Sequence, residues 1–517
     1  MDGTVPPLGR LAELKARYQF TVLADEAHSL LSMGATGKGS VEMWNEDHPE
    51  DHVPLDIFDI RTATLSKAIG ALGGIVFGTS KFEKAILSRR NELLRNASEP
   101  LVPASMVQAL YVLGQPSRVQ RNLRRLKAII AFMRAELTEA GIYIYGNATT
   151  PVLPIHTGRP SLAAELSYVL RQQGILATPI ATPAVPLWEA RVRVCLSADF
   201  SDDTVNSLVR GLIRSCQTVG IIGKMHQKPK VFTFKDELKP LIEVELSEMA
   251  NSQQYVRSLI LQDKDSVPQT DKHATNLIQA GHIARNQYGI ASGAPRWTTG
   301  TYAVHIAVEK AVSEQTATEA TMTFPDSRIG LMSSIAALCR PLIGFKKHYL
   351  LLPKDTPAAV KEGVKVAPRK GAPTTKYYDS AQSLLQILKS LCDKDTYITL
   401  YIDSQLQSSN IFFHREMRNL FLSKTRPGMT ILLDNHERPE RVPDLDIVKT
   451  AKCCGAQLAV YGSFSRTYGL PGAYLASKKQ LIDEQRYTSR GYMYTTSPLP
   501  FVMGMISEAL ASGKEQA

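Results

Sequence analysis

The chain has 517 residues, of which 44% are hydrophobic and 21% charged, and its formal net charge is +11. This length exceeds what one hydrophobic core supports, so we expect two or three α/β units. The composition is typical of a globular protein and contains no run of roughly 18 apolar residues, the length that a membrane span needs. The six cysteines lack metal-binding spacing and no secretory signal opens the chain. We therefore expect reduced thiols, no metal site and a cytoplasmic protein.

The positive charge is compatible with an anionic ligand, such as a phosphate cofactor, coenzyme A or an acidic membrane surface. The basic residues of segment 118–134 recur at helical spacing against Leu123, Leu126 and Ile129. This pattern is typical of the solvated face of an amphipathic helix, so we do not expect nucleic-acid binding.

Residues 1–110 have the pattern of part of an α/β domain. A helix is predicted over residues 9–18, followed by a buried strand over 20–24 that ends at Asp25. The segment 45–52 alternates Asp, Glu and His, but its proline separates the two histidines. We therefore expect a solvated loop there rather than a metal site.

The segment 62–78, TATLSKAIGALGGIVFG, has an apolar, β-like pattern and a single lysine, Lys67. Glycines follow this lysine, and glycine allows a flat ligand to approach the backbone closely. Taken alone, Lys67 is more often a surface lysine than a nucleophile.

Residues 120–222 are expected to form a small α+β domain with short strands and covering helices. Its predicted strands cover 142–145, 152–155 and 191–197, and its helices 162–173 and 202–219. Residues 223–275 are charged and lack a strand pattern, so we expect a linker.

Residues 276–517 are predicted to form a second α/β unit. Its probable buried strands, 396–403 and 429–434, both end in Asp. The sequence from Ser465 to Gly472 matches that from Ser66 to Gly73 without a gap, and Arg466 stands where Lys67 would be. The spacing indicates one fold used twice. Because arginine does not lose its proton at physiological pH, only the first half could form a Schiff base.

Pyridoxal 5′-phosphate would explain the joint placement of these polar residues. Lys67 would form a Schiff base with its aldehyde, and Asp25 would keep its ring nitrogen protonated. Thr64 could donate to the phosphate and His28 to the ring oxygen. The alternatives are that Asp25 caps a turn and that His28 is an ordinary loop residue.

Four segments resemble the α-oxoamine synthases, and in particular the catalytic subunit of serine palmitoyltransferase. These segments are 23–39 (LADEAHSLLSMGATGKG), 64–74 (TLSKAIGALGG), 144–155 and 181–198. The second half resembles the non-catalytic subunit, which lacks the lysine. A catalytic half fused to such a half is similar in organisation to fungal synthases of sphinganine-analogue toxins.

The resemblance implies a partly duplicated fold type I pyridoxal-phosphate transferase, with a parallel-rich sheet flanked by helices and a small α+β domain. It implies Arg193 as the ligand of the amino acid carboxylate. It also implies that Thr496 and Ser497 reach the phosphate bound by the first half, as in a subunit interface. The chain would then be its own pseudo-dimer, or part of a homo- or hetero-oligomer.

The sequence also departs from the family. Family members have a long segment before the position that matches Met1, which carries sheet strands, a phosphate loop and a histidine that stacks on the cofactor. We therefore expect residues 1–222 to be the C-terminal part of a catalytic unit whose start is missing from this chain.

The predicted activity is the decarboxylative condensation of an amino acid with a long-chain acyl-CoA or other acyl thioester, for a sphingoid base or its analogue. The alternatives are a non-catalytic partner of a full-length synthase and a class I/II aminotransferase. The cytoplasm is the expected location, with peripheral attachment to the endoplasmic reticulum as an alternative.

Overall fold

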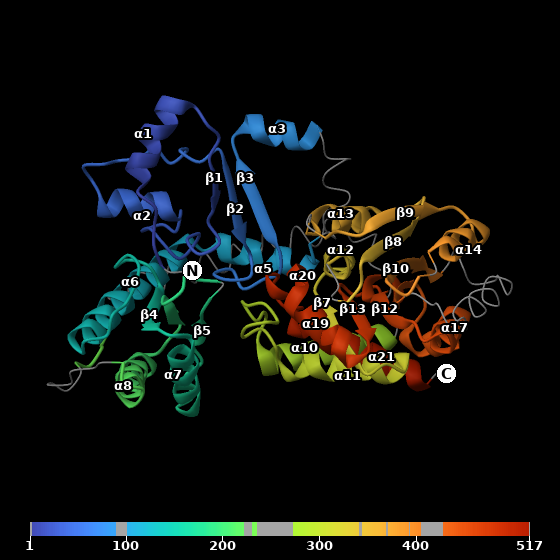
Figure 1. Cartoon of the computed structure of the whole chain (residues 1–517). Helices are drawn as coiled ribbons and strands as arrows, with labels where there is room; N and C mark the ends of the chain where they lie inside the picture. Colours follow the sequence, from blue (N-terminus) through green and yellow to red (C-terminus); the bar gives the residue numbers. More distant parts are fainter. Residues whose placement is uncertain are drawn as a thin grey trace. The chain divides into compact units, whose positions relative to one another are not determined.

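The computed structural model describes residues 3–88, 101–182, 184–221, 230–234, 272–340, 344–368, 371–391, 393–404 and 428–515. The chain forms two compact units (Figure 1). The first unit comprises Met1–Ile69, Gly73–Ala85 and Pro103–Val267, and the second comprises Gly70–Leu72, Ile86–Val102 and Pro268–Ala517. Within the described residues, no helix is both long enough and apolar enough to cross a bilayer.

The N-terminal part of the first unit contains a three-stranded sheet. Its elements are α1 (Leu8–Tyr18), β1 (Leu23–Asp25), α2 (Ser40–Asp47), β2 (Ile60–Thr64), β3 (Gly74–Gly78) and α3 (Ser80–Ser88). Strand β2 is central, parallel to β1 and antiparallel to β3. The predicted strand over 20–24 is thus shorter and begins later.

The prediction of a loop over 45–52 was wrong at its start. Residues up to Asp47 belong to α2, which ends just before Pro49 because proline disfavours helical geometry in the residue that precedes it. His48 stacks on Trp44 with their ring centroids 3.9 Å apart. Asn45 exchanges two hydrogen bonds of 2.8 Å with the backbone of Val53. The segment is therefore tied to its own unit by packing and backbone contacts.

The small α+β part of the first unit agrees largely with the prediction. It consists of α5 (Pro103–Leu113), α6 (Pro116–Glu139), β4 (Val152–Gly158), α7 (Pro160–Gln172), β5 (Thr178–Ile180), β6 (Ala190–Cys195) and α8 (Asp202–Thr218). Strand β6 lies between β4 and β5 in an antiparallel sheet. Its core joins Ile129 and Met133 of α6 to Leu153 and Val192 of the sheet. The strand predicted over 142–145 is reduced to one bridge, between Ile144 and Ile155.

Most of the expected linker, 223–275, lies outside the described residues. Residues 272–275 are described and belong to α10, so the predicted linker extends too far at its end. The other described part, 230–234, packs on the small domain of the first unit. The side chain of Asn206 accepts from Phe232 N at 2.6 Å and donates to Phe232 O at 3.0 Å. The ring of Phe232 is buried in the small-domain core.

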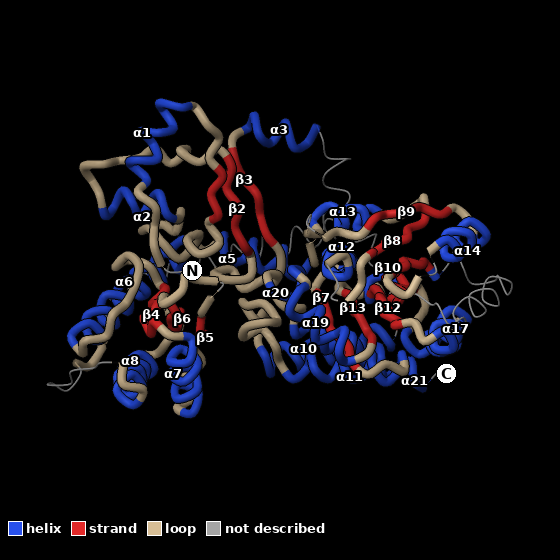
Figure 2. Tube along the Cα trace, viewed as in Figure 1, coloured by secondary structure: helices blue, strands red, loops and turns tan. Residues whose placement is uncertain are grey.

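The second unit is built on a seven-stranded sheet (Figure 2). The strands are β7 (Ala320–Phe324), β8 (Lys347–Pro353), β9 (Thr374–Tyr378), β10 (Thr396–Asp403), β11 (Gly428–Asn435), β12 (Gln457–Ser463) and β13 (Ala473–Ser477). Their order is β7-β13-β12-β11-β10-β8-β9. Strand β13 is antiparallel to both of its neighbours, β7 and β12, and every other pair of neighbouring strands is parallel. A parallel-rich sheet with helices is the predicted α/β class.

Helices cover both faces of this sheet, as buried strands require. They are α10 (Lys272–Tyr288), α11 (Ala303–Thr316), α12 (Ser327–Leu338), α13 (Ala358–Val366), α14 (Ala381–Ser390), α17 (Asp446–Cys454), α18 (Phe464–Tyr468), α19 (Lys479–Thr488), α20 (Arg490–Met493) and α21 (Pro500–Glu515), with the 3-10 helix η2 (Pro439–Asp444). Leu400 and Ile402 of β10 point into one core and Tyr401 into the other. Helix α10 lies along α21 (Figure 1).

Candidate active site

The carboxyl ends of β1 and β2 form the candidate site of the first unit. The two strands are parallel, and Asp25 lies opposite Thr62. Lys67 follows β2 in a turn that is closed by a 2.9 Å hydrogen bond from Leu65 N to Gly73 O. Gly73 has a φ of 124°, which residues with a Cβ adopt only with strain. Asp25 and Lys67 therefore leave the same edge of the sheet, where ligands bind in parallel α/β folds.

The amino group of Lys67 has a lowered pKa. Lys67 is an exposed residue, and partial desolvation of its amino group is the main cause of the shift; the charge of Arg193 adds to it, whereas Asp25 opposes it. Among the described residues, we find no hydrogen-bond partner for this amino group. A lowered pKa increases the fraction of neutral amine, which is the nucleophilic form.

His28 lies in the same electrostatic environment. Burial, together with the charges of Lys67 and Arg193, lowers its pKa to about 4, against the opposing effect of Asp25. The imidazole is therefore neutral at physiological pH and retains one donor and one acceptor nitrogen. The His28 carbonyl accepts a 2.7 Å hydrogen bond from the Ser32 hydroxyl, which fixes the turn that carries the ring.

Arg193 comes from the centre of the small sheet, where it lies opposite Pro154 of β4 and Thr178 of β5. Its Nε is buried and has no hydrogen-bond partner among the described residues. Arg191, two residues earlier on the same face, is in contrast paired with Glu189 at 3.0 Å and lies over the Tyr145 ring. Of these two arginines of β6, Arg193 is therefore the one whose Nε can still donate a hydrogen bond to a ligand.

Thr64 ends β2, and its hydroxyl lies 2.7 Å from that of Ser66. It also accepts a 3.2 Å hydrogen bond from Ser66 N. The structure thus brings Asp25, His28, Lys67 and Arg193 within electrostatic range of one another and places Thr64 three residues before the lysine.

Thr496 and Ser497 lie in the second unit, just before α21. The Ser497 hydroxyl is buried and donates to the carbonyls of Ala294, at 3.1 Å, and Gly300, at 2.5 Å. Thr496 forms an isolated β-bridge with Pro295. Within their own unit they therefore fix the 294–300 loop. The expectation that they reach a phosphate in the first unit stays a prediction.

The second unit repeats the geometry of the first at the ends of β11 and β12. Asp434 lies opposite Tyr461, as Asp25 lies opposite Thr62. Phe464 N donates to Gly472 O at 2.9 Å, as Leu65 N does to Gly73 O. The φ of Gly472 is 114°, close to the 124° of Gly73. The repeat seen in the sequence is thus a repeat of strand register, turn and backbone conformation.

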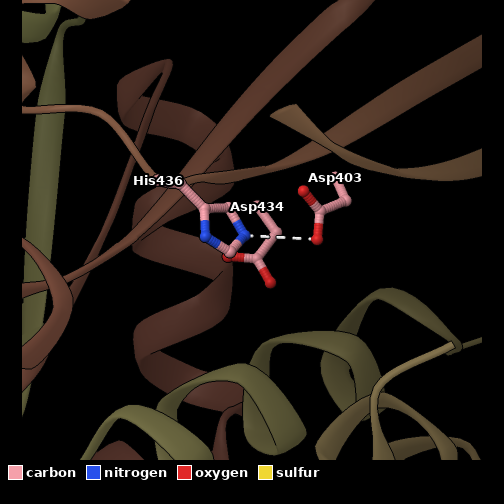
Figure 3. Close-up of side chains that lie close together, drawn as sticks. All are labelled: Asp403, Asp434 and His436. Carbon is pink, nitrogen blue, oxygen red and sulfur yellow. Dashed lines mark hydrogen bonds and ion pairs between the residues drawn. The ribbon is translucent and has the colours of Figure 1, made fainter. Parts of the chain in front are cut away.

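Arg466 stands at the lysine position of this repeat and pairs with the aspartate. Its Nη2 lies 2.5 Å from Asp434 Oδ1, and the other carboxylate oxygen accepts a 2.7 Å hydrogen bond from Tyr401. Its Nη1 contacts both ring nitrogens of His436, the nearer at 2.7 Å. His436 in turn lies 3.2 Å from Asp403 (Figure 3).

The ligand atoms of Asp403, Asp434 and His436 all lie within 4.8 Å of one another, as in a metal site. However, the guanidinium of Arg466 is already a cation bound to this cluster. Because this cation already pairs with Asp434, the cluster does not require a metal ion, and we assign none here.

The sequence predicted Asp25, His28, Thr64, Lys67 and Arg193, but not the network around Arg466. Its signals were present, since the strands before Asp403 and Asp434 both end in aspartate. The sequence does not give the strand order. The two aspartates lie opposite each other because β10 and β11 are neighbours in the sheet.

Comparison with known proteins gives relatives that cover nearly the whole chain and others that cover about two fifths of it. The family described as aminotransferase class I and II matches residues 1–212. Aminotransferase FUM8 of Gibberella moniliformis is 25% identical over 553 aligned residues, which cover 98% of this chain and 99% of the relative. Serine palmitoyltransferase 2 of Saccharomyces cerevisiae is 31% identical over 218 residues, which cover 41% of this chain but 37% of the relative.

A putative 8-amino-7-oxononanoate synthase of Desulfovibrio desulfuricans is 32% identical over 212 residues, which cover 40% of this chain and 51% of the relative. This enzyme and serine palmitoyltransferase are both α-oxoamine synthases, so the resemblance inferred from the motifs of the first half is confirmed. Residues 1–212 are therefore similar to the class I and II aminotransferases, which are fold type I transferases, and the same part of the chain is similar to α-oxoamine synthases.

Proposed function

We propose that the first unit binds pyridoxal 5′-phosphate at Lys67 and catalyses the decarboxylative condensation of an amino acid with a long-chain acyl thioester. The observation that carries this proposal is that Lys67, Asp25 and His28 lie at or just after the ends of β1 and β2 and that Arg193 of β6 lies close enough to shift the pKa values of Lys67 and His28. When bound, the cofactor supplies an electron sink for the substrate α-carbon.

The residues present fit this cofactor. Lys67 offers an amine that is neutral more often than an ordinary lysine, because partial desolvation lowers its pKa. Asp25 is an exposed carboxylate at the strand end, suited to a protonated ring nitrogen. His28 stays neutral at pH 7 and can donate a hydrogen bond to the ring oxygen without adding positive charge. The hydroxyl of Thr64 is suited to hold the phosphate.

Arg193 would hold the amino acid carboxylate. Its Nε lacks a partner among the described residues, and a guanidinium offers two parallel donors to a carboxylate. Fixing the carboxylate decides which bond at the α-carbon aligns with the cofactor ring, and so whether a proton or carbon dioxide leaves.

The thioester substrate is proposed from the relatives. Serine palmitoyltransferase and 8-amino-7-oxononanoate synthase match the first unit alone. The full-length fungal relatives are instead named aminotransferases, including Aminotransferase ALT4 of Alternaria alternata. Transamination by the same lysine is therefore the second candidate function. A sphingoid base or an analogue is the product class that we propose for the condensation.

The second unit would act as the partner that this family finds in another subunit, through Thr496 and Ser497, whether within one chain or in an oligomer. A chain that only supports another synthase remains the non-catalytic alternative. Peripheral attachment to the endoplasmic reticulum also stays a prediction.

Product analysis separates these candidates. The purified chain is incubated with pyridoxal phosphate, carboxyl-labelled amino acids and palmitoyl-CoA, and released carbon dioxide and free thiol are measured. We expect equal amounts of both from the unchanged chain and none from Lys67→Ala. The variant Lys81→Ala, which removes an exposed lysine of α3, is the matched control and should retain the activity. A keto acid without carbon dioxide would identify an aminotransferase, and no turnover from a folded, cofactor-loaded chain would favour the partner role.

A further inference from the structure

The site of the second unit repeats that of the first, but its aspartate is in a different environment. Asp25 is exposed and accepts a 2.9 Å hydrogen bond from Ala27 N. Asp434 is 3% exposed. A buried carboxylate is strongly destabilising unless a positive charge and hydrogen bonds compensate for its lost hydration. The second unit therefore needs a permanent cation beside Asp434.

Arg466 supplies that cation from within the chain. Its guanidinium lies 2.5 Å from Asp434. The same guanidinium contacts His436, and His436 in turn contacts Asp403. Burial is the largest single influence on the pKa of Arg466 and lowers it, but Asp434, together with Tyr461 and Tyr401, raises it, and the pKa is raised overall. The guanidinium is therefore always charged and never a nucleophile.

A cavity of about 390 Å³ lies beside this ion pair. Hydroxyl side chains line it, from Ser327 at the start of α12 and from Ser463 and Ser465 around the end of β12. Ser463 and Ser465 occupy the positions of Thr64 and Ser66 in the repeat. The start of a helix and nearby hydroxyls are groups that suit an anion such as a phosphate. The cavity thus has groups that suit a phosphate, as a cofactor site would, but it has an arginine in place of the lysine.

We propose that Arg466 takes the place of the cofactor in the second unit. Its guanidinium gives Asp434 the positive charge that a protonated ring nitrogen would otherwise bring, so this unit folds without pyridoxal phosphate and does not bind it. The same geometry implies that a lysine at position 466 would free the aspartate and reopen the cavity to the cofactor. This inference rests on the proposed function of the first unit, and it implies that one chain holds one cofactor.

The test uses the full chain with Lys67→Ala, so that covalent attachment can be read in the second unit. Pyridoxal phosphate is added to Lys67→Ala, to Lys67→Ala/Arg466→Lys and to Lys67→Ala/Arg466→Met, followed by borohydride. In a covalent product, the lysine nitrogen bonds to the aldehyde carbon, the aldehyde oxygen leaves as water, and borohydride adds hydride to the resulting double bond. Mass spectrometry of peptides then locates the added group, and equilibrium dialysis counts bound cofactor.

We expect no cofactor binding to the second unit of Lys67→Ala or of the methionine variant, and attachment at position 466 in the lysine variant. Bound cofactor should also raise the melting temperature of the second unit in the lysine variant alone. Cofactor bound to the second unit of Lys67→Ala would overturn the proposal, and so would a folded lysine variant that takes no label at position 466. The melting temperature of the second unit of Lys67→Ala, measured with and without cofactor, decides the first point even where the double variant does not fold.

The two proposals fail separately in this experiment. Absence of label at Lys67 in the unchanged chain contradicts the proposed function of the first unit. The label at position 466 is mapped on a different peptide and reports on the second unit alone.

Discussion

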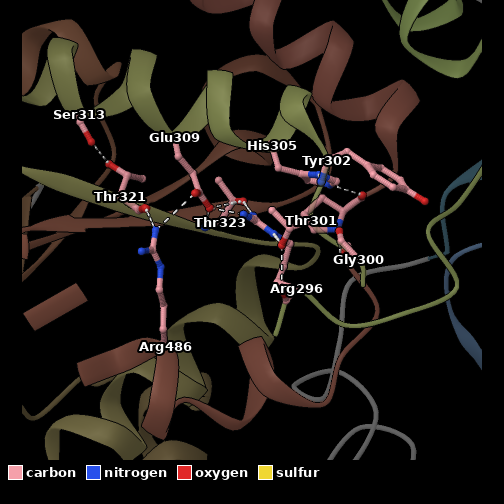
Figure 4. A network of polar contacts seen from close by, with 12 residues as sticks. Arg296, Gly300, Thr301, Tyr302, His305, Glu309, Ser313, Thr321, Thr323 and Arg486 are labelled. Atoms are coloured by element: carbon pink, nitrogen blue, oxygen red, sulfur yellow. Dashed lines mark hydrogen bonds and ion pairs between the residues drawn. The ribbon is translucent and has the colours of Figure 1, made fainter. Parts of the chain in front are cut away.

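Replacing Arg296 by methionine should destabilise the second unit by about 3 kcal/mol. Arg296 is 4% exposed, and its Nη1 lies 2.7 Å from Glu309 Oε1 (Figure 4). The same carboxylate oxygen accepts hydrogen bonds from the backbone and side chain of Thr323, at 3.0 and 3.1 Å. Removing the guanidinium leaves a buried carboxylate that has lost its main counter-charge.

The magnitude follows from what remains around Glu309. Loss of one partner of a buried ion pair costs roughly 3–5 kcal/mol. Arg486 stays 3.5 Å from the other carboxylate oxygen and compensates in part, so we expect the lower end of this range. For a unit of this size, about 3 kcal/mol corresponds to a fall in melting temperature of roughly 6–12 °C.

The assay is urea unfolding, followed by hydrogen exchange of peptides from β10, which report on the second unit. The double variant Arg296→Met/Glu309→Leu should recover much of the loss, because neither charge is then buried. Lys346→Ala removes one partner of the exposed pair with Asp395 and should leave the melting temperature unchanged. If Arg296→Met were as stable as the unchanged chain, the ion pair would not carry the stability assigned to it.

Three further predictions concern a histidine, a turn and the substrate. Burial lowers the pKa of His305 to about 4, so the unfolded chain binds a proton that the folded chain does not between pH 6.5 and 4. The second unit should therefore lose up to about 3 kcal/mol as the pH falls through this window, which His305→Gln should reduce in urea titrations. Gly472→Ala should lower the free energy of unfolding of the second unit by at least about 2 kcal/mol, because its φ is 114° and an added Cβ would lie 2.9 Å from Phe324 O. Gly469→Ala, whose Cβ would meet open space, should lower it by about half as much. Arg193→Lys should raise the KM for the amino acid about tenfold while cofactor binding, measured by absorbance, is retained; an unchanged KM would contradict the carboxylate role.

Much of the fold could be predicted from periodicity alone. The long amphipathic helix α6 and the buried strands β10 and β11 were predicted because each has a continuous pattern over many residues. The helix α2 was missed because its eight residues include Asp, Glu and Asn, which in isolation favour loops. It is held by packing of Trp44 and Met43 in the core. Propensity was overruled there by tertiary contacts.

The candidate site was predicted in its residue types but not in its electrostatics. Lys67 and Asp25 could be placed because both follow predicted strands, and parallel strands bring their ends to one edge. The shifts of Lys67 and His28 depend on Arg193, which is more than a hundred residues away in the sequence. The partners of Arg466 could likewise be found only once the strand order was known.

The central claim is that Lys67 is the residue of this chain that holds pyridoxal phosphate. The most direct measurement is a peptide map of the unchanged chain after incubation with the cofactor and reduction with borohydride. We expect one equivalent of added cofactor on the peptide that contains Lys67, and none on peptides of the second unit. Specific labelling of another lysine, or none at Lys67 in the folded protein, would contradict it.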